Sequence, residues 1–445
     1  MLYLYTVLTN ILLLIGTLLS IAGIIIIHEL GHYLAARINK LYAASVSIGF
    51  GKLLAQHKDS YGTSWELRAW PLGGYVDLVG NDNAKSHQWH NLYYLQKSSI
   101  ILAGVCSNLI LAWLLLSSTA YIGFEQRSNI IAKVYTQTPA AKMQLLPGDK
   151  IIAVDNIPVA NIEQTMLTLA ITHSQKPILN VTIEREGKTH TLQTDTNWQL
   201  IQEKSSITRN FGINFQRDYA PATISKVNDF SAAEQAGLRR YDKIISINNQ
   251  PVYHAHDVTD YLRDHPKEPL ILRVKRQHHT LTIKLPQAHK AMRTIHFMPP
   301  KKITSEYFYY QENLAKASLS SCTLIYQHLY LQTRIIYEII TGQLSIHILS
   351  GPVEILQLSL MLSHSMIFIL WLRWLAAINI SLAFINTLPI PILDGGQWFI
   401  LTITTLTGLK PSQTLLECIN YISIFIIAFT LSVVTYFEII NIIIT

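Results

Sequence analysis

The chain has 445 residues, and its 35 Lys and Arg against 28 Asp and Glu give a formal net charge of +7. Hydrophobic residues make up 49% of the chain but charged residues only 14%, compared with about 25% in soluble globular proteins. This composition excludes a disordered chain and argues against an ordinary soluble enzyme, so we expect apolar membrane spans that alternate with water-soluble parts.

Four apolar stretches reach the roughly 20 residues that a helix needs to cross a bilayer. They cover residues 7–27, 98–123, 366–388 and 419–440. The first stretch lacks a basic leader and a small-residue cleavage site, so we expect a retained span and not a signal peptide. The predicted fold class is therefore a polytopic α-helical membrane protein with four transmembrane helices.

The distribution of Lys and Arg over short loops predicts which side of the membrane each loop faces. The first six and the last five residues carry no Lys or Arg, whereas residues 37–97 carry seven. We therefore expect this loop in the cytoplasm, with both termini and the long segment 124–365 on the outer side. No dense Lys and Arg cluster with interleaved aromatic residues is present, so nucleic acid is not indicated as a partner.

The segment between the second and third spans contains an internal repeat. Residues 145–159 (LLPGDKIIAVDNIPV) and 238–252 (LRRYDKIISINNQPV) match at an offset of 93 residues. Each copy predicts a strand, an Asn turn and a second strand, which suits two tandem α+β domains. Both copies resemble PDZ domains, which bind extended peptides by strand addition. Because Gln144 and Tyr241 replace glycines of that pattern near the carboxylate-binding loop, peptide receptors and purely structural modules both remain open.

These patterns divide the chain into eight segments. We expect the first span over 1–36, a cytoplasmic-side loop over 37–97, the second span over 98–123, PDZ-like domains over 124–205 and 206–290, an amphipathic helical segment over 291–365 that includes Tyr307–Tyr310, the third span and its following motif over 366–397, and a connecting segment with the fourth span over 398–445.

The first span ends in His28-Glu29-Leu30-Gly31-His32. On a helix, the two His lie one turn apart on one face, so both imidazoles can reach one metal ion while Glu29 acts as a general base. Ionisable residues in a span are costly and are mostly functional, although a cluster at the membrane interface is the alternative. The chain has three widely spaced cysteines and no C-x-x-C pair, so thiolate metal ligands are not indicated. We expect these cysteines to be buried as small apolar residues: Cys106, Cys322 and Cys418.

A zinc hydrolase site requires a third protein ligand. Asp394 is the only carboxylate between residues 366 and 409, and Pro389 and Pro391 interrupt the preceding helix so that its side chain can turn inward. The four-span topology places Asp394 on the same side as the two His. Asn386, slightly earlier, could donate a hydrogen bond to a substrate carbonyl or serve only in helix packing.

The H-E-x-x-H motif, the run from Asn386 to Gln397 (NTLPIPILDGGQ) and the paired PDZ-like repeats together resemble the site-2 protease family, most closely its RseP-type bacterial branch. The resemblance extends to residues 47–51, 70–76 and 349–352, and so covers nearly the whole chain. It implies one Zn²⁺ per chain bound by His28, His32 and Asp394, with Glu29 as the base and Asn386 in substrate binding. The branch usually has Asn where this chain has Ser381, with Asn379 two residues earlier, so a role for either residue stays open.

Residues 45–48 and 65–76 are β-rich and Gly-punctuated, which predicts a hairpin-like sheet after the first span. The resemblance implies a membrane re-entrant β-loop here, whose edge could pair with a substrate helix that has unwound into a strand. The candidate substrate-binding residues of this loop are Gly49, Phe50, Gly73, Gly74 and Tyr75.

The implied function is that of an intramembrane zinc endopeptidase in the bacterial inner membrane, with periplasmic termini and PDZ-like domains and an active site near the cytoplasmic side. The implied substrates within the lipid bilayer are single-span membrane proteins, such as an anti-sigma factor after a first-site cut, and signal-peptide remnants. Two alternatives remain: a membrane zinc protease that takes its third ligand from a downstream Glu, and a catalytically inactive, membrane-anchored PDZ scaffold.

Overall fold

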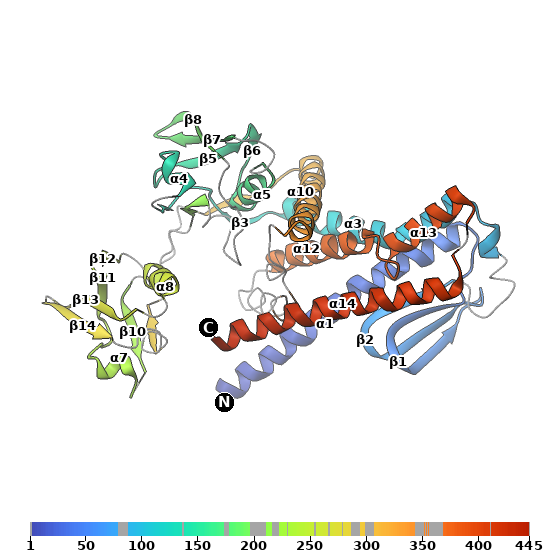
Figure 1. Ribbon diagram of the computed structural model, residues 1–445, viewed down its shortest axis with the longest axis horizontal. Coiled ribbons are helices and arrows are strands. Elements are labelled where there is room, and N and C mark those ends of the chain that lie inside the picture. The colour runs from blue at the N-terminus through green and yellow to red at the C-terminus, as the bar shows by residue number, and fades with distance from the viewer. Residues whose placement is uncertain are drawn as a thin grey trace.

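The computed structural model shows an elongated molecule with long helices and a β-hairpin on one side and two β-rich modules on the other (Figure 1). The chain's N- and C-terminal helices both have their outer ends on the side nearer the modules, and the hairpin lies at the opposite end of the helices (Figure 1). The residues described are 2–78, 88–135, 138–172, 178–195, 211–215, 222–228, 230–252, 255–265, 268–277, 279–285, 294–298, 307–342, 351, 353, 355, 368–409 and 411–444.

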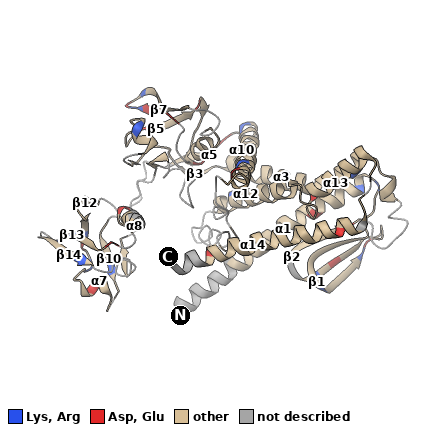
Figure 2. Ribbon diagram, viewed as in Figure 1, with Lys and Arg blue, Asp and Glu red and all other residues tan. Residues whose placement is uncertain are grey.

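Four of the described helices are long and apolar enough to cross a membrane, as predicted. They are α1 (Leu2–Ile38), α3 (Tyr94–Ile122), α12 (Phe368–Thr387) and α14 (Gln413–Ile444). Charged residues are sparse along these helices and more frequent on the rest of the ribbon (Figure 2). A bilayer core about 30 Å thick fits helices of about 20 residues, so the chain is a membrane-spanning protein by length and composition.

After α1, strands β1 (Ser45–Lys58) and β2 (Ser64–Asp77) form a long antiparallel hairpin. Both strands bend, so that residues 45–48 pair with residues 74–77 on one side and with residues 64–67 on the other. Gly49 and Gly51 have φ angles of 89° and 82°, a conformation that glycine adopts without strain. The hairpin therefore folds back on itself, and Val46 packs with Tyr33 and Ala43 against the inner part of α1.

The two repeats form matching modules, each with a four-stranded sheet in the same strand order. The first contains β4 (Lys133–Val134), α4 (Pro139–Lys142), β5 (Lys150–Val154), β6 (Ile157–Pro158), α5 (Ile162–Thr172), β7 (Ile178–Arg185), β8 (Lys188–Asp195) and β9 (Ile213–Asn214). The second contains β10 (Ile224–Val227), α7 (Ala232–Gln235), β11 (Lys243–Ile247), β12 (Gln250–Pro251), α8 (Ala255–Asp264), β13 (Leu270–Arg276), β14 (His279–Leu285) and β15 (Ile295–Phe297).

The same buried ion pair stabilises both modules. Arg185 donates to both carboxylate oxygens of Asp149 at 2.6 and 2.7 Å, and Arg276 donates to both oxygens of Asp242 at 2.7 Å. The two aspartates occupy equivalent positions of the repeat and are almost fully buried. Each guanidinium also donates to a backbone carbonyl, that of Gln144 or Gly237, at the turn before the first sheet strand. The repeat in sequence is therefore a repeat in structure.

The first module is joined to the membrane helices by α10 (Leu314–Ile340). One apolar cluster combines side chains of α3, α5, α10 and α12: Ala112, Leu116, Leu167, Leu324, Ala376 and Ile380. Beside it, Arg373 of α12 donates a 2.5 Å hydrogen bond to Glu163 of α5. Strand β3 (Phe124–Arg127), which follows α3, pairs with β16 (Tyr307–Tyr310) just before α10. This junction connects the first module to α12, the helix that leads to Asp394.

Several predicted details are wrong. Tyr307–Tyr310 forms strand β16 and Ile295–Phe297 forms β15, because aromatic and β-branched residues favour strands, so only part of the segment 291–365 is helical. The first module extends to residue 215, where Phe211, Ile213 and Phe215 enter its core, and not to residue 205. The part of 398–445 expected to be a connecting segment contains helix α13 (Asp394–Thr407). The three cysteines, predicted to be buried, are exposed, because they lie on outward faces of helices: Cys106, Cys322 and Cys418.

Candidate metal centre

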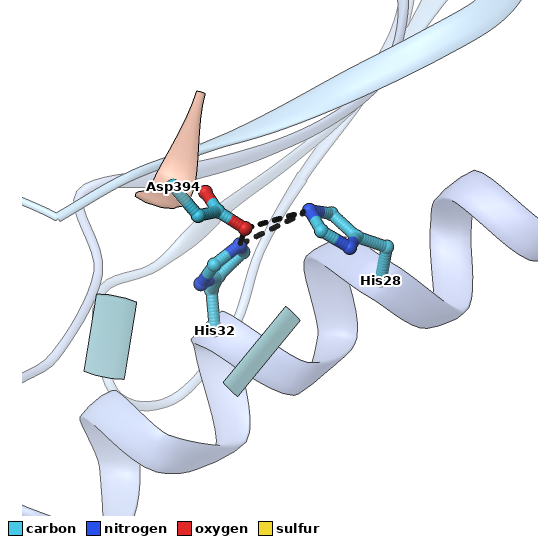
Figure 3. A group of neighbouring side chains, drawn as sticks. All are labelled: His28, His32 and Asp394. Atoms are coloured by element: carbon cyan, nitrogen blue, oxygen red, sulfur yellow. Dashed lines mark hydrogen bonds and ion pairs between the residues drawn. The ribbon is translucent and has the colours of Figure 1, made fainter. Parts of the chain in front are cut away.

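The two His of the H-E-x-x-H motif lie inside α1, one helical turn apart, and their rings face the same side (Figure 3). Their Nε2 atoms are 3.3 Å apart. The Nδ1 atom of His32 lies 2.8 Å from the backbone oxygen of Ile100 on α3. Since a carbonyl oxygen can only accept, Nδ1 of His32 carries a proton, and in the neutral ring Nε2 then keeps its lone pair. The helix thus aims two ring nitrogens at one point.

Asp394 reaches the same point from the opposite side (Figure 3). Helix α12 ends at Thr387, residues 388–393 are non-helical, and α13 begins at Asp394. Gly395 and Gly396 lie against backbone carbonyls of this loop, and a Cβ on either would overlap them. The absence of these side chains lets the chain turn tightly enough to place the Asp394 carboxylate 3.2 Å from Nε2 of His28 and 3.4 Å from Nε2 of His32.

The three ligand atoms fit a tetrahedral metal ion. Ligands about 2.0–2.2 Å from such an ion lie about 3.3–3.6 Å from one another. The three distances here are 3.2, 3.3 and 3.4 Å. The Oδ2 atom of Asp394 is also buried without a hydrogen-bond donor among the described residues. His28, His32 and Asp394 are the one group of potential metal ligands found within the described residues, and their two nitrogens and one oxygen match the preference of zinc.

Glu29 borders a cavity of about 600 Å³ that the three candidate ligands also line. On β2, Gly74 lies so close that a Cβ there would be 3.4 Å from the Glu29 side chain. The hairpin therefore orients Glu29 toward the cavity. A carboxylate that lies beside two candidate metal ligands and faces a cavity has the placement that a general base requires.

The hairpin residues predicted to bind substrate lie around this cavity. Phe50, Gly74 and Tyr75 line it directly. The rings of Phe50 and Tyr75 are stacked with centroids 6.4 Å apart, and Gly73 leaves the space that the Phe50 ring occupies. Gly49 does not line the cavity but precedes Phe50 at a bend of β1. The edge formed by residues 74–77 thus lies next to Glu29.

The structure does not bring every predicted residue to the cavity. Asn386 lies in the last turn of α12 and is not among the described residues that line it. Asn379 donates to the backbone oxygen of Leu375 within α12, and Ser381 accepts a 2.8 Å hydrogen bond from Gln332 of α10. These last two side chains therefore contribute to helix packing in this arrangement.

Two residues of α3 that the sequence interpretation missed contact the His pair. A Cβ on Gly104 would overlap Nε2 of His32 and would lie 2.6 Å from Cε1 of His28, so both imidazoles use the space that this glycine leaves. Asn108, fully buried, lies 3.2 Å from Nδ1 of His28 through its side-chain amide. A signal was present, because Asn108 is the only carboxamide or charged residue in the apolar stretch 98–123.

Comparison with known proteins agrees with this geometry. The sequence model of peptidase family M50 matches residues 16–430. The regulator of sigma E protease of Salmonella typhi is 29% identical over 409 residues, which cover 88% of this chain and 90% of that protein. The regulator of sigma-E protease RseP of Escherichia coli (strain K12) is 26% identical over 406 residues, with 88% and 90% covered. A putative zinc metalloprotease of Xylella fastidiosa is 27% identical over 427 residues, with 92% and 95% covered. The chain therefore belongs to peptidase family M50, the site-2 protease family of zinc metalloproteases.

Proposed function

We propose that this protein is an intramembrane endopeptidase that hydrolyses peptide bonds within transmembrane segments of single-span membrane proteins. The observation that carries this proposal is the meeting of His28, His32 and Asp394, which come from two membrane-associated parts of the chain, at the spacing that one zinc ion requires. Their position beside four potential membrane spans supports cleavage at membrane depth and not in a soluble domain.

In the proposed site, His28, His32 and Asp394 hold one Zn²⁺ through two nitrogens and one oxygen. When bound there, zinc polarises the scissile carbonyl and lowers the pKa of a water molecule. Glu29 takes the proton of the attacking water and passes it to the leaving amine, so it acts first as a base and then as an acid. The close approach of Gly74 on β2 to the Glu29 side chain keeps its carboxylate beside the cavity during both steps.

We assign substrate positioning to the hairpin. A peptide bond inside a helix is shielded by the helix backbone, so the substrate must unwind before it can be cut. The edge formed by residues 74–77 lies beside Glu29 and could pair with the unwound segment as an added strand. In this proposal, the hairpin is a re-entrant β-loop, and Gly49, Phe50, Gly73, Gly74 and Tyr75 shape the path of the substrate. Asn386 stays a candidate contact for a substrate that extends beyond the cavity.

The topology and substrate class are part of the same proposal. The Lys and Arg of residues 37–97 support a cytoplasmic hairpin in a bacterial inner membrane. The outer ends of α1 and α14 and both modules lie away from the hairpin, which supports a periplasmic location for them (Figure 1). The repeats support PDZ-like domains that screen out substrates with bulky outer domains. The names of the relatives, regulators of sigma E, support an anti-sigma factor as one substrate after a first cut; signal-peptide remnants are a second proposed class.

Substitution of the proposed base tests this function. Glu29→Gln keeps the size of the side chain but removes its ability to accept a proton, and Glu29 is not a metal ligand in the proposed site. We expect the purified variant to keep the zinc content of the wild type, measured by elemental analysis, and to lose cleavage of a single-span reporter protein by at least 100-fold. Cleavage at the wild-type rate by a zinc-loaded Glu29→Gln variant would refute the assignment.

A further inference from the structure

The two candidate His ligands differ in what holds their second ring nitrogen. Nδ1 of His32 donates to the backbone oxygen of Ile100 at 2.8 Å, so its orientation does not depend on any one side chain of α3. Nδ1 of His28 faces the side-chain amide of Asn108 at 3.2 Å. Asn108 is fully buried on α3. The orientation of His28 therefore depends on a side chain that can be changed.

The protonation of the His28 ring determines whether the oxygen or the nitrogen of the Asn108 amide can face its Nδ1 atom. If Nε2 of His28 binds a metal through its lone pair, the neutral ring carries its proton on Nδ1 and must donate it. An amide NH₂ group cannot accept that proton, but the amide oxygen can. The two ends of an Asn amide are exchanged by a half-turn of the side chain, and their assignment follows from the hydrogen-bond network. When Nδ2 of Asn108 points toward His28, its Oδ1 is buried without a hydrogen-bond partner. A half-turn of the Asn108 amide places Oδ1 toward His28 and removes this mismatch.

We propose that Asn108 is a positioning residue of the metal centre: its side-chain oxygen accepts the Nδ1 proton of His28 and holds Nε2 of that ring toward His32 and Asp394. This inference rests on the proposed zinc site and extends it to a residue of α3. Partners that accept the second N–H of a metal-bound His fix its tautomer and orientation, and their loss typically lowers metal affinity by about 10- to 100-fold. Gly104, one turn earlier on α3, leaves the space in which the two rings meet.

Two substitutions separate this role from general packing. Asn108→Leu keeps a similar volume but has no acceptor, so we expect the zinc affinity of the purified full-length protein to fall by about 10- to 100-fold. Asn108→Asp has two acceptor oxygens and no donor, so it can still accept the His28 proton, and we expect zinc affinity within about threefold of the wild type. If Asn108 instead donated to His28, the Asp variant would be the weaker binder of the two.

The measurement is zinc affinity by competition with a chelator of known strength, in detergent, which does not depend on proteolytic activity. Asn379→Leu is the matched control, because Asn379 is an equally buried amide in a membrane helix and donates a hydrogen bond to the backbone oxygen of Leu375 within α12; its zinc affinity should not change. Loss of zinc in the Leu variant alone supports the proposal. Retention in Asn108→Leu, loss in Asn108→Asp, or an equal loss in Asn379→Leu contradicts it. A wild-type protein that binds no zinc would instead contradict the proposed function.

Discussion

Asp394 joins the metal centre from a different part of the chain than the two His. Its position near the two His depends on the non-helical break between α12 and α13, whereas His28 and His32 lie within one continuous helix. Asn in its place is neutral and a weaker ligand, so we expect Asp394→Asn to lower zinc affinity by at least 10-fold. Zinc content of the purified variant after dialysis checks this. Full occupancy would remove Asp394 from the site and favour a third ligand from a downstream Glu.

Gly104 is the second residue on which the site depends, because α3 passes directly beside both imidazoles there. We expect Gly104→Ala to displace His28 or His32, at a cost of about 1–3 kcal/mol, and to reduce zinc affinity by about 10- to 100-fold. Zinc competition on the purified variant measures this.

Gly23 of α1 offers a matched control, because a Cβ there would meet nothing within 4 Å. Gly23→Ala adds a methyl group to a helix interior, where Ala is favoured over Gly by up to about 1 kcal/mol. It should leave zinc affinity unchanged. Equal behaviour of the two variants would mean that the close approach at Gly104 has no role in the site.

At the scale of elements, a single ion pair anchors the sheet of each module to the turn before it. Asp242 is fully buried, and Arg276 neutralises it through two hydrogen bonds. The hydrogen bonds with Asp242 raise the pKa of the Arg276 guanidinium above its ordinary value, so Arg276 stays charged in the physiological range. Arg276 therefore supplies a constant positive charge next to the buried Asp242 carboxylate.

Removal of Arg276 leaves a buried carboxylate without its counter-charge, which typically costs about 3–5 kcal/mol. Because the guanidinium is itself partly exposed, we expect about 3 kcal/mol for Arg276→Met. Faster amide hydrogen exchange over β11, β13 and β14 in the full-length protein would show the loss. Arg273→Met, on the same strand but with an exposed side chain, should leave exchange unchanged. Similar exchange in both variants would contradict a stabilising role for the pair.

The elements also differ in how well the sequence predicts them. Long apolar runs identify the four membrane helices because the bilayer imposes their length. The H-E-x-x-H motif places two candidate ligands by helix geometry alone, and Pro389 and Pro391 before α13 point to a turn at Asp394. Asn108 and Gly104 could not be assigned in this way, because their contacts with His28 and His32 depend on how α3 packs against α1. Likewise, β9 joins the first module by pairing with β4, although the two strands lie far apart in the sequence.

At the scale of the whole molecule, the first module meets the membrane helices through the apolar cluster around Leu324 and the pair of Arg373 with Glu163. Arg373 is mostly buried and also lies over the Phe124 ring at 4.9 Å. A charge near the end of a membrane helix requires such partners. The pair therefore contributes to holding the first module on α10 and α12.

We expect Glu163→Gln to weaken this docking by on the order of 1 kcal/mol, since Glu163 is partly exposed, and to raise hydrogen exchange in α5 a few-fold. Exchange measured by mass spectrometry on the full-length protein tests this. Glu184→Gln on β7, where the side chain is exposed, is the control and should have no effect. No difference between the two variants would show that the apolar cluster alone holds the module.

The central claim is that Glu29, His28, His32 and Asp394 together cut a peptide bond at membrane depth. The most direct measurement is mass spectrometry of the products when purified wild-type protein and Glu29→Gln, each loaded with zinc, act on the same single-span reporter in membranes. We predict that the wild type cuts within the reporter's transmembrane segment and that Glu29→Gln yields no product there. A cut confined to the soluble part of the reporter, or the same products from both proteins, would contradict the claim.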